Sequence, residues 1–125
     1  MPVDMSTVDT LQAALTYHRE RHTVLAGNIA NIDTPGYRPV DLDRHPADDP
    51  GTMAVTHEGH LSSATGPDFV TSFDDGGKLA SWDGNAVSLE RELSKIDANR
   101  TRYSTSSELV SRRLAMLRYA AGDGT

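Results

Sequence analysis

Apolar residues recur at alternating spacings of three and four at both ends of this chain, which is typical of long helices that pack along each other. The N-terminal stripe is Val8, Leu11, Leu15, His18, His22, Leu25, Ile29 and Ile32. The C-terminal stripe is Leu89, Leu93, Ile96, Arg100, Tyr103, Ser107, Val110, Leu114, Leu117 and Ala121. At 1.5 Å per residue these helices would span roughly 35 and 50 Å. We expect an all-α fold with an antiparallel, coiled-coil-like core of two long terminal helices.

The segment between the stripes has a different composition. Residues 38–84 contain six glycines, four prolines, and nine acidic against three basic side chains. Glycine and proline at this density interrupt regular structure. We expect residues 1–37 and 85–125 to form a helical core domain and residues 38–84 to be largely irregular, with room for one short β-hairpin that turns at residues 74–77.

Boundary signals bracket the second helix. Residues 83–85 predict a turn and cap before it, and Glu90 and Glu92 would lie in its early turns, where carboxylates complement the helix dipole. Three arginines lie towards its other end: Arg112, Arg113 and Arg118. They would complement the dipole there or meet an acidic partner, and Gly122 and Gly124 are expected to stop the helix.

The composition predicts a thin core and excludes several functions. With 37% hydrophobic residues and seven aromatics, the helix pair can bury little apolar surface, so we expect the monomer to be partly disordered until neighbouring subunits cover it. The net charge of −6 argues against a nucleic-acid partner. There is no cysteine, so thiolate chemistry is excluded. The first residues do not resemble a cleavable signal peptide.

The stretch that follows the first stripe is built to end a helix. Residues 28–37 are Asn-Ile-Ala-Asn-Ile-Asp-Thr-Pro-Gly-Tyr. Asn28 and Asn31 can hydrogen-bond to backbone at a helix C-terminus, and Pro35 disfavours helical backbone before it. Gly36 permits the positive φ of a tight turn, after which Tyr37 can pack back on the helix. A capped helix end and a subunit contact both fit these residues.

These residues resemble the signature of the flagellar axial (rod and hook) proteins, whose first helix ends in Asn-x-x-Asn-x-x-Thr-Pro-Gly-Tyr. The resemblance covers residues 21–43, and further blocks at 56–61 and 85–92 follow in the same order. It implies a structural subunit of the proximal rod of the bacterial flagellar basal body, a protein that polymerises through its terminal helices and is neither an enzyme nor a cofactor binder. Export through the flagellar type III apparatus into the periplasmic rod, without signal cleavage, is implied as well.

The resemblance also implies partners: other rod proteins, further copies of the chain, a membrane-ring or adaptor protein at the base, and the export apparatus, with no nucleic acid and no small-molecule substrate. The residues expected to carry subunit contacts are Leu11, Leu15, Leu25, Asn28, Ile29, Asn31, Thr34, Pro35, Gly36, Tyr37, Leu93, Ile96, Tyr103, Val110, Leu114 and Leu117. Another rod protein of the family, or a helical type III secretion adaptor that does not polymerise, are the alternatives.

Histidines and carboxylates suggest metal sites only weakly. His57 and His60 miss the spacing of a zinc-protease helix by one residue, and no EF-hand order links the acidic residues 41–49. His18 and His22 interrupt the first stripe, as Arg100 and Ser107 interrupt the second. We therefore predict no metal ligands, no catalytic residues and no cofactor contacts. Antiparallel pairing would align the four interrupting residues across the helix pair, either as a tolerated wet stretch or as a polar layer that sets register or faces a neighbour.

Overall fold

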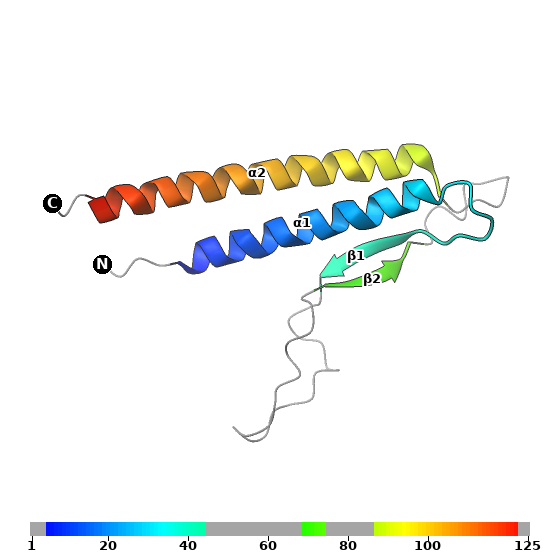
Figure 1. Cartoon of the computed structure of the whole chain (residues 1–125), viewed down its shortest axis with the longest axis horizontal. Helices are drawn as coiled ribbons and strands as arrows, with labels where there is room; N and C mark the ends of the chain where they lie inside the picture. Colours follow the sequence, from blue (N-terminus) through cyan, green and yellow to red (C-terminus); the bar gives the residue numbers. More distant parts are fainter. Residues whose placement is uncertain (1–4, 45–68, 75–86, 123–125) are drawn as a thin grey trace, which may run out of the picture.

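The computed structural model describes residues 5–44, 69–74 and 87–122. Helix α1 spans Ser6–Ala30 and helix α2 spans Leu89–Gly122. Figure 1 shows the two helices side by side and antiparallel, with both chain ends at the same end of the pair. The predicted fold class, two long terminal helices as the core, is confirmed.

The helix boundaries agree in part with the sequence signals. Glu90 and Glu92 lie in the first turn of α2, as predicted. Helix α2 ends at Gly122, in agreement with the predicted stop there, and Gly124 lies outside the described residues. The last turn of α2 holds no basic residue, because the helix continues four residues past Arg118, so the three arginines lie before that turn. The predicted cap at residues 83–85 lies outside the described residues.

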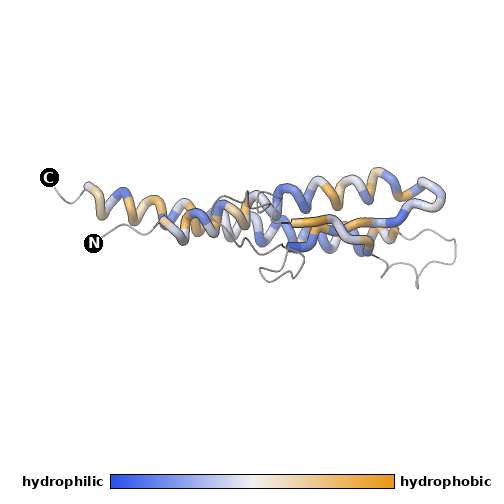
Figure 2. Tube along the Cα trace, turned by 90° about the horizontal axis from the view of Figure 1, so that it is seen from below, coloured by the Kyte–Doolittle hydropathy of each residue, from blue (hydrophilic) through white to orange (hydrophobic). Residues whose placement is uncertain are grey.

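A short antiparallel hairpin flanks the helix pair. Strand β1, Val40–Arg44, pairs with strand β2, Phe69–Phe73, so that Leu42 faces Thr71. The expectation of one short hairpin is confirmed, but β2 pairs with a strand that precedes it, not with one that follows a turn at 74–77. Residues 75–77 of that turn lie outside the described part. Figures 1 and 2 show the hairpin along the half of the helix pair that is remote from both termini.

The core of the described residues is as polar as it is apolar. The buried apolar side chains are Val8, Leu25, Leu42 and Val87. The buried polar ones are His18, Asn28, Glu92 and Asn99. Figure 2 shows hydrophobic and hydrophilic residues alternating along both helices. Apolar burial is therefore modest, and hydrogen bonds between buried polar groups define how the two helices pair.

Helix α2 presents a different face to α1 than the stripe predicts. Ile96, Val110 and Leu117 are half-buried, in agreement with the stripe, but Leu93 is 51% and Leu114 46% exposed. Glu92 and Asn99 are buried in their place. Each lies one position before a stripe residue, which is roughly 100° around the helix. The face of α2 that meets α1 is therefore rotated to one side of the predicted stripe. Buried hydrogen bonds from these two side chains account for the difference.

The predicted polar layer is also different. His18 is buried and contacts Asn99 instead of Arg100 or Ser107, while His22, Arg100 and Ser107 are exposed. His22 follows His18 by four residues and lies towards the solvent side of α1. The layer therefore consists of a single inter-helix pair, because only residues that face the partner helix directly can satisfy each other when buried.

Candidate functional site

The helix exit is a hydrogen-bonded turn. The Asn31 side chain donates from Nδ2 to the Gly27 carbonyl at 2.8 Å, which satisfies a carbonyl at the end of α1. The Tyr37 amide donates to the Thr34 carbonyl at 3.2 Å across the Pro35-Gly36 pair, and Gly36 has φ +74°. Proline second and glycine third, with a positive φ at the glycine, is the arrangement of a type II turn. The predicted positive φ and backbone bond of Asn31 are confirmed.

Asn28 is the hydrogen-bonding hub between α1 and the residues that follow the exit turn. Its fully buried side chain donates from Nδ2 to the Val40 carbonyl and to Glu92 Oε2, both at 2.8 Å. Its Oδ1 accepts from the Val40 amide at 3.1 Å and from the Tyr37 hydroxyl at 3.2 Å. The amide thus meets Val40 as a peptide group of a neighbouring strand would. One residue ties α1 to the exit turn, to β1 and to α2.

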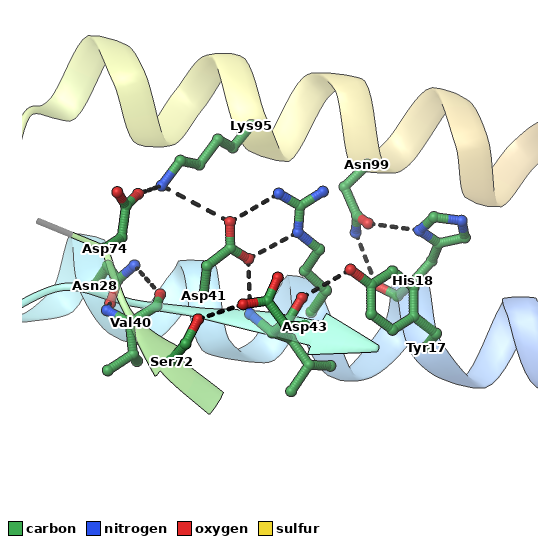
Figure 3. A network of polar contacts seen from close by, with 12 residues as sticks. Tyr17, His18, Asn28, Val40, Asp41, Asp43, Ser72, Asp74, Lys95 and Asn99 are labelled. Atoms are coloured by element: carbon green, nitrogen blue, oxygen red, sulfur yellow. Dashed lines mark hydrogen bonds and ion pairs between the residues drawn. The ribbon is translucent and has the colours of Figure 1, made fainter. Parts of the chain in front are cut away.

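A network of charges extends from this hub through Glu92, and Figure 3 shows its members Asp41, Asp74 and Lys95. The Lys95 ammonium on α2 donates to Glu92 Oε1 at 3.0 Å, contacts Asp74 after β2, and lies 3.9 Å from Asp41 on β1. Arg21 on α1 donates two hydrogen bonds of 2.8 Å to the Asp41 carboxylate. Arg91 on α2 also belongs to the network and donates to Asp74 Oδ1 at 2.8 Å.

The network contains three cations and three carboxylates, so it is electrically balanced. Its side chains are mostly shielded from water: Arg21, Asp41, Asp74 and Lys95 are each less than one-fifth exposed. Ion pairs in such surroundings are screened less by salt than surface pairs. Because the pairs join α1 and α2 to β1, and α2 to Asp74 directly after β2, they fix the hairpin against the helix pair.

Asp41 is held in its charged form. Burial raises the pKa of Asp41, but the hydrogen bonds from Arg21 and the Leu42 amide, with the charges of Arg21 and Lys95, outweigh it, so the pKa lies below its ordinary value. The hydrogen bond to Asp41 raises the pKa of Arg21 above its ordinary value despite burial. The pair therefore stays ionised at neutral pH.

A second polar contact lies further along α1. Asn99 Nδ2 donates to the His18 carbonyl at 2.7 Å, and Asn99 Oδ1 lies 2.8 Å from His18 Nδ1. Since the carbonyl contact identifies Nδ2, the other amide atom is an acceptor and Nδ1 of His18 carries the proton. Tyr17, beside His18, donates its hydroxyl to the Leu42 carbonyl at 2.7 Å. These contacts give the helix pair one register and seat β1 on α1.

The predicted contact residues fall into three groups. Leu25 and Asn28 are buried in the subunit. Half-buried residues are Leu11, Leu15, Ile29, Asn31, Tyr37, Ile96, Val110 and Leu117. Exposed residues are Thr34, Pro35, Gly36, Leu93, Tyr103 and Leu114. The structure brings Asn28 and Tyr37 together, and only the exposed group is freely accessible to a neighbour. Their role as subunit contacts stays a prediction.

Several residues of the network were not predicted from the sequence. Glu92 and Lys95 are three apart on one helix, a spacing that permits an ion pair, and this was the only local signal. Arg21 and Asp41 lie twenty residues apart on different elements. Asn99, next to Arg100 in the sequence, carried no sign of its partner His18.

Two general features bear on what the described residues can hold. No group of three or more histidines and carboxylates among residues 5–44, 69–74 and 87–122 is arranged to bind a metal ion. Neither helix, as described, is long and apolar enough to cross a membrane. The histidine pair at 57 and 60 and the acidic residues 48 and 49 lie outside this part of the chain.

Comparisons with known proteins agree with the resemblance. The family model described as "Flagella basal body rod protein" matches residues 8–38, which span most of α1 and the exit turn. The flagellar basal body rod protein FlgB of Aeromonas hydrophila is 30% identical over 112 residues, 85% of each chain. FlgB of Aquifex aeolicus is 34% identical over 78% of each chain. FlgB of Cereibacter sphaeroides is 33% identical over 83% of this chain and 84% of its own.

Two paired terminal helices joined to a rigid exit turn define a helical structural subunit, and the match over that turn indicates a component of the flagellum. The chain belongs to the FlgB family of flagellar basal body rod proteins. The family resemblance expected from the sequence is confirmed, and the protein is a structural subunit of the flagellar basal body rod.

Proposed function

We propose that this chain polymerises in the proximal rod through exposed apolar residues of its terminal helices, as a building block without catalytic activity. The observation that carries the proposal is the exposure of Leu93, Tyr103 and Leu114 on α2, at 51%, 42% and 46%. These residues follow the heptad stripe, yet the subunit leaves roughly half of each side chain exposed. Apolar residues at helical spacing that the subunit leaves exposed are typical of an interface.

The exit turn is a second contact in this proposal. Thr34, Pro35 and Gly36 are exposed, while Asn28 and Tyr37 fix the turn from inside. A turn held in one conformation loses little entropy when a partner binds it. It therefore supports the use of these three residues as a rigid surface for a neighbouring subunit.

The partners in this proposal are further copies of the chain, other rod proteins, a ring or adaptor protein at the base, and the export apparatus that delivers the chain to the periplasm without signal cleavage. Support comes from the relatives, all of which bear the name of a basal body rod protein. The exposed stripe suits partners that are themselves helical, because helices interdigitate along apolar ridges.

The decisive experiment localises a tagged chain in purified basal bodies of the bacterium that encodes it. The Leu93→Ser/Leu114→Ser variant should fold, because both side chains are half exposed, but should be lost from the basal bodies and fail to restore swimming. Leu93→Met/Leu114→Met, which keeps the apolar surface, is the matched control. Normal incorporation of the serine variant would contradict the role of the stripe.

Purification separates this role from that of a non-polymerising secretion adaptor. A rod subunit with exposed apolar stripes should gain helix content with concentration, since neighbours complete its burial. Circular dichroism at 222 nm across a hundredfold concentration range measures this. A fully helical monomer that melts cooperatively at every concentration would favour the adaptor and remove the proposal of folding on assembly. We also propose that residues 1–37 and 85–125 together form a helical core domain, distinct from residues 38–84.

A further inference from the structure

The register of the helix pair carries one end of α2 past the start of α1. His18 lies opposite Asn99, so in an antiparallel pair Ser6, twelve residues before His18, lies opposite Ser111. Helix α2 continues to Gly122, about eleven residues or roughly 16 Å further. Figure 1 shows this end of α2 reaching past the start of α1. We call residues 112–122 the overhang.

The overhang combines apolar and basic side chains. Met116 is 62% and Tyr119 74% exposed, the largest exposures among the large hydrophobic residues described. Arg112, Arg113 and Arg118 are its only charged residues. Arg112 pairs with Glu108 one turn earlier, at 2.9 Å, in an exposed contact of little strength. Arg113 is half-buried, whereas Arg112 and Arg118 are exposed. At 100° per residue Arg112, Met116 and Tyr119 fall within a sector of about 60°, with Arg118 roughly 100° beyond Tyr119, so this side of the overhang is apolar and positively charged.

The opposite end of α2 has the complementary character. Leu89 is 46% and Leu93 51% exposed, and Glu90 and Asp97 are exposed beside them. At 100° per residue these four positions fall within a sector of about 100° on one side of the helix. The two basic residues of this stretch, Arg91 and Lys95, are bound to Asp74, so the charge offered to a neighbour is negative. We call these four residues the acidic head.

We propose that the overhang of one copy docks on the acidic head of the next copy, as a head-to-tail contact between two α2 helices. The contact joins two different surfaces of the same chain, so it leaves a free head and a free overhang after each addition. Such heterologous contacts build open chains instead of closed dimers. The inference rests on the proposed polymerisation and names the surfaces that it uses.

Charge exchange tests the contact on the full-length chain. The overhang variant is Arg112→Glu/Arg118→Glu, the head variant is Glu90→Arg/Asp97→Arg, and sedimentation velocity at low salt measures self-association. Each variant alone should need at least about tenfold more protein to associate, since two ion pairs are replaced by like charges. An equimolar mixture should associate again, because each positive surface then meets a negative one. Rescue in the mixture also shows that both variants are folded.

The matched control for the overhang variant is Arg19→Glu/Arg102→Glu, which makes the same change of charge at exposed arginines away from both ends of α2. It should associate like the unaltered chain. Equal association of all variants, or no recovery in the mixture, would overturn the head-to-tail contact.

Engineered disulfides provide an independent readout, because the chain has no cysteine of its own. Residues 93 and 116 lie roughly 35 Å apart on one helix, so a disulfide between them must join two copies. Equimolar mixed Leu93→Cys and Met116→Cys chains should form the 93–116 dimer well above the roughly twofold excess over either homodimer that random pairing gives. A statistical mixture of dimers, or no association of the unaltered chain at any concentration, would sink the inference. The localisation in basal bodies decides the proposed function separately, since the chain could enter the rod through other surfaces.

Discussion

Replacing Asn28 by aspartate changes one NH2 group into an oxygen inside the fully buried hub. The Asn28 side chain makes four hydrogen bonds, and two of them depend on Nδ2 as donor. Aspartate cannot donate when it is charged, so the Val40 carbonyl and Glu92 Oε2 lose that donor. Each loss costs about 1–3 kcal/mol, and the new carboxylate lies beside that of Glu92. We expect the free energy of unfolding to fall by about 3 kcal/mol or more.

Urea unfolding followed by circular dichroism at 222 nm, at a low and fixed protein concentration, measures the change. Asn31→Asp is the matched control, because the same substitution three residues later removes only the bond to the Gly27 carbonyl and should cost about 1 kcal/mol. Burial and the nearby Glu92 favour the protonated form of the carboxyl group introduced by Asn28→Asp. The stability deficit of that variant should therefore shrink as the pH falls.

Glu92 provides a second test of the Asn28 contacts. In Asn28→Asp/Glu92→Gln the glutamine amide can donate to the aspartate, so the double variant should be more stable than the two single losses added together predict. A loss for Asn28→Asp within about 0.5 kcal/mol of that for Asn31→Asp, or strict additivity with Glu92→Gln, would refute the assignment of Asn28 as the hub.

Four other predictions concern the charge network, the exit turn and the His18–Asn99 pair. Lys95→Met leaves three carboxylates without their shared cation and should cost about 3 kcal/mol in urea unfolding, whereas Arg112→Met, which removes an exposed pair, should cost less than about 0.5 kcal/mol. Gly36→Ala should lower the melting temperature because φ +74° strains any other residue, and Gly27→Ala, in a helix with open space around it, should raise the melting temperature. The low pKa of Asp41 means that its stabilisation is complete above the unfolded-state value near 4 and is lost as the pH falls through the lower folded-state value; Asp41→Asn should be less stable at neutral pH and flatter in a titration of unfolding free energy from about pH 6 to about pH 2. His18→Leu should destabilise the pair by about 1–3 kcal/mol by leaving buried Asn99 Oδ1 without a donor, while His22→Leu, at an exposed site, should change little, and a stabilised His18→Leu chain would contradict the inter-helix pair.

The sequence pattern alone was sufficient to predict the two helices and the exit turn. The three-four spacing predicts both helices, since a helix repeats its faces every 3.6 residues whatever packs against them. The Pro35-Gly36 pair predicts a turn with a positive φ for the same reason: the backbone preferences of these residues are local. The signature at residues 28–37 likewise indicates the family before any contact is known, because its chemistry lies in one short segment.

Only the tertiary structure decided which face of α2 meets α1 and how the hairpin is seated. Glu92 and Asn99 are charged or polar, and a sequence pattern assigns such residues to the solvent face. They are buried because Asn28 and His18, some sixty-four and eighty-one residues away along the chain, supply the matching groups. The same holds for Arg21 and Asp41. A polar side chain can be buried when its hydrogen bonds are satisfied, and the partners that satisfy them are set by the fold, not by the neighbouring residues in the sequence.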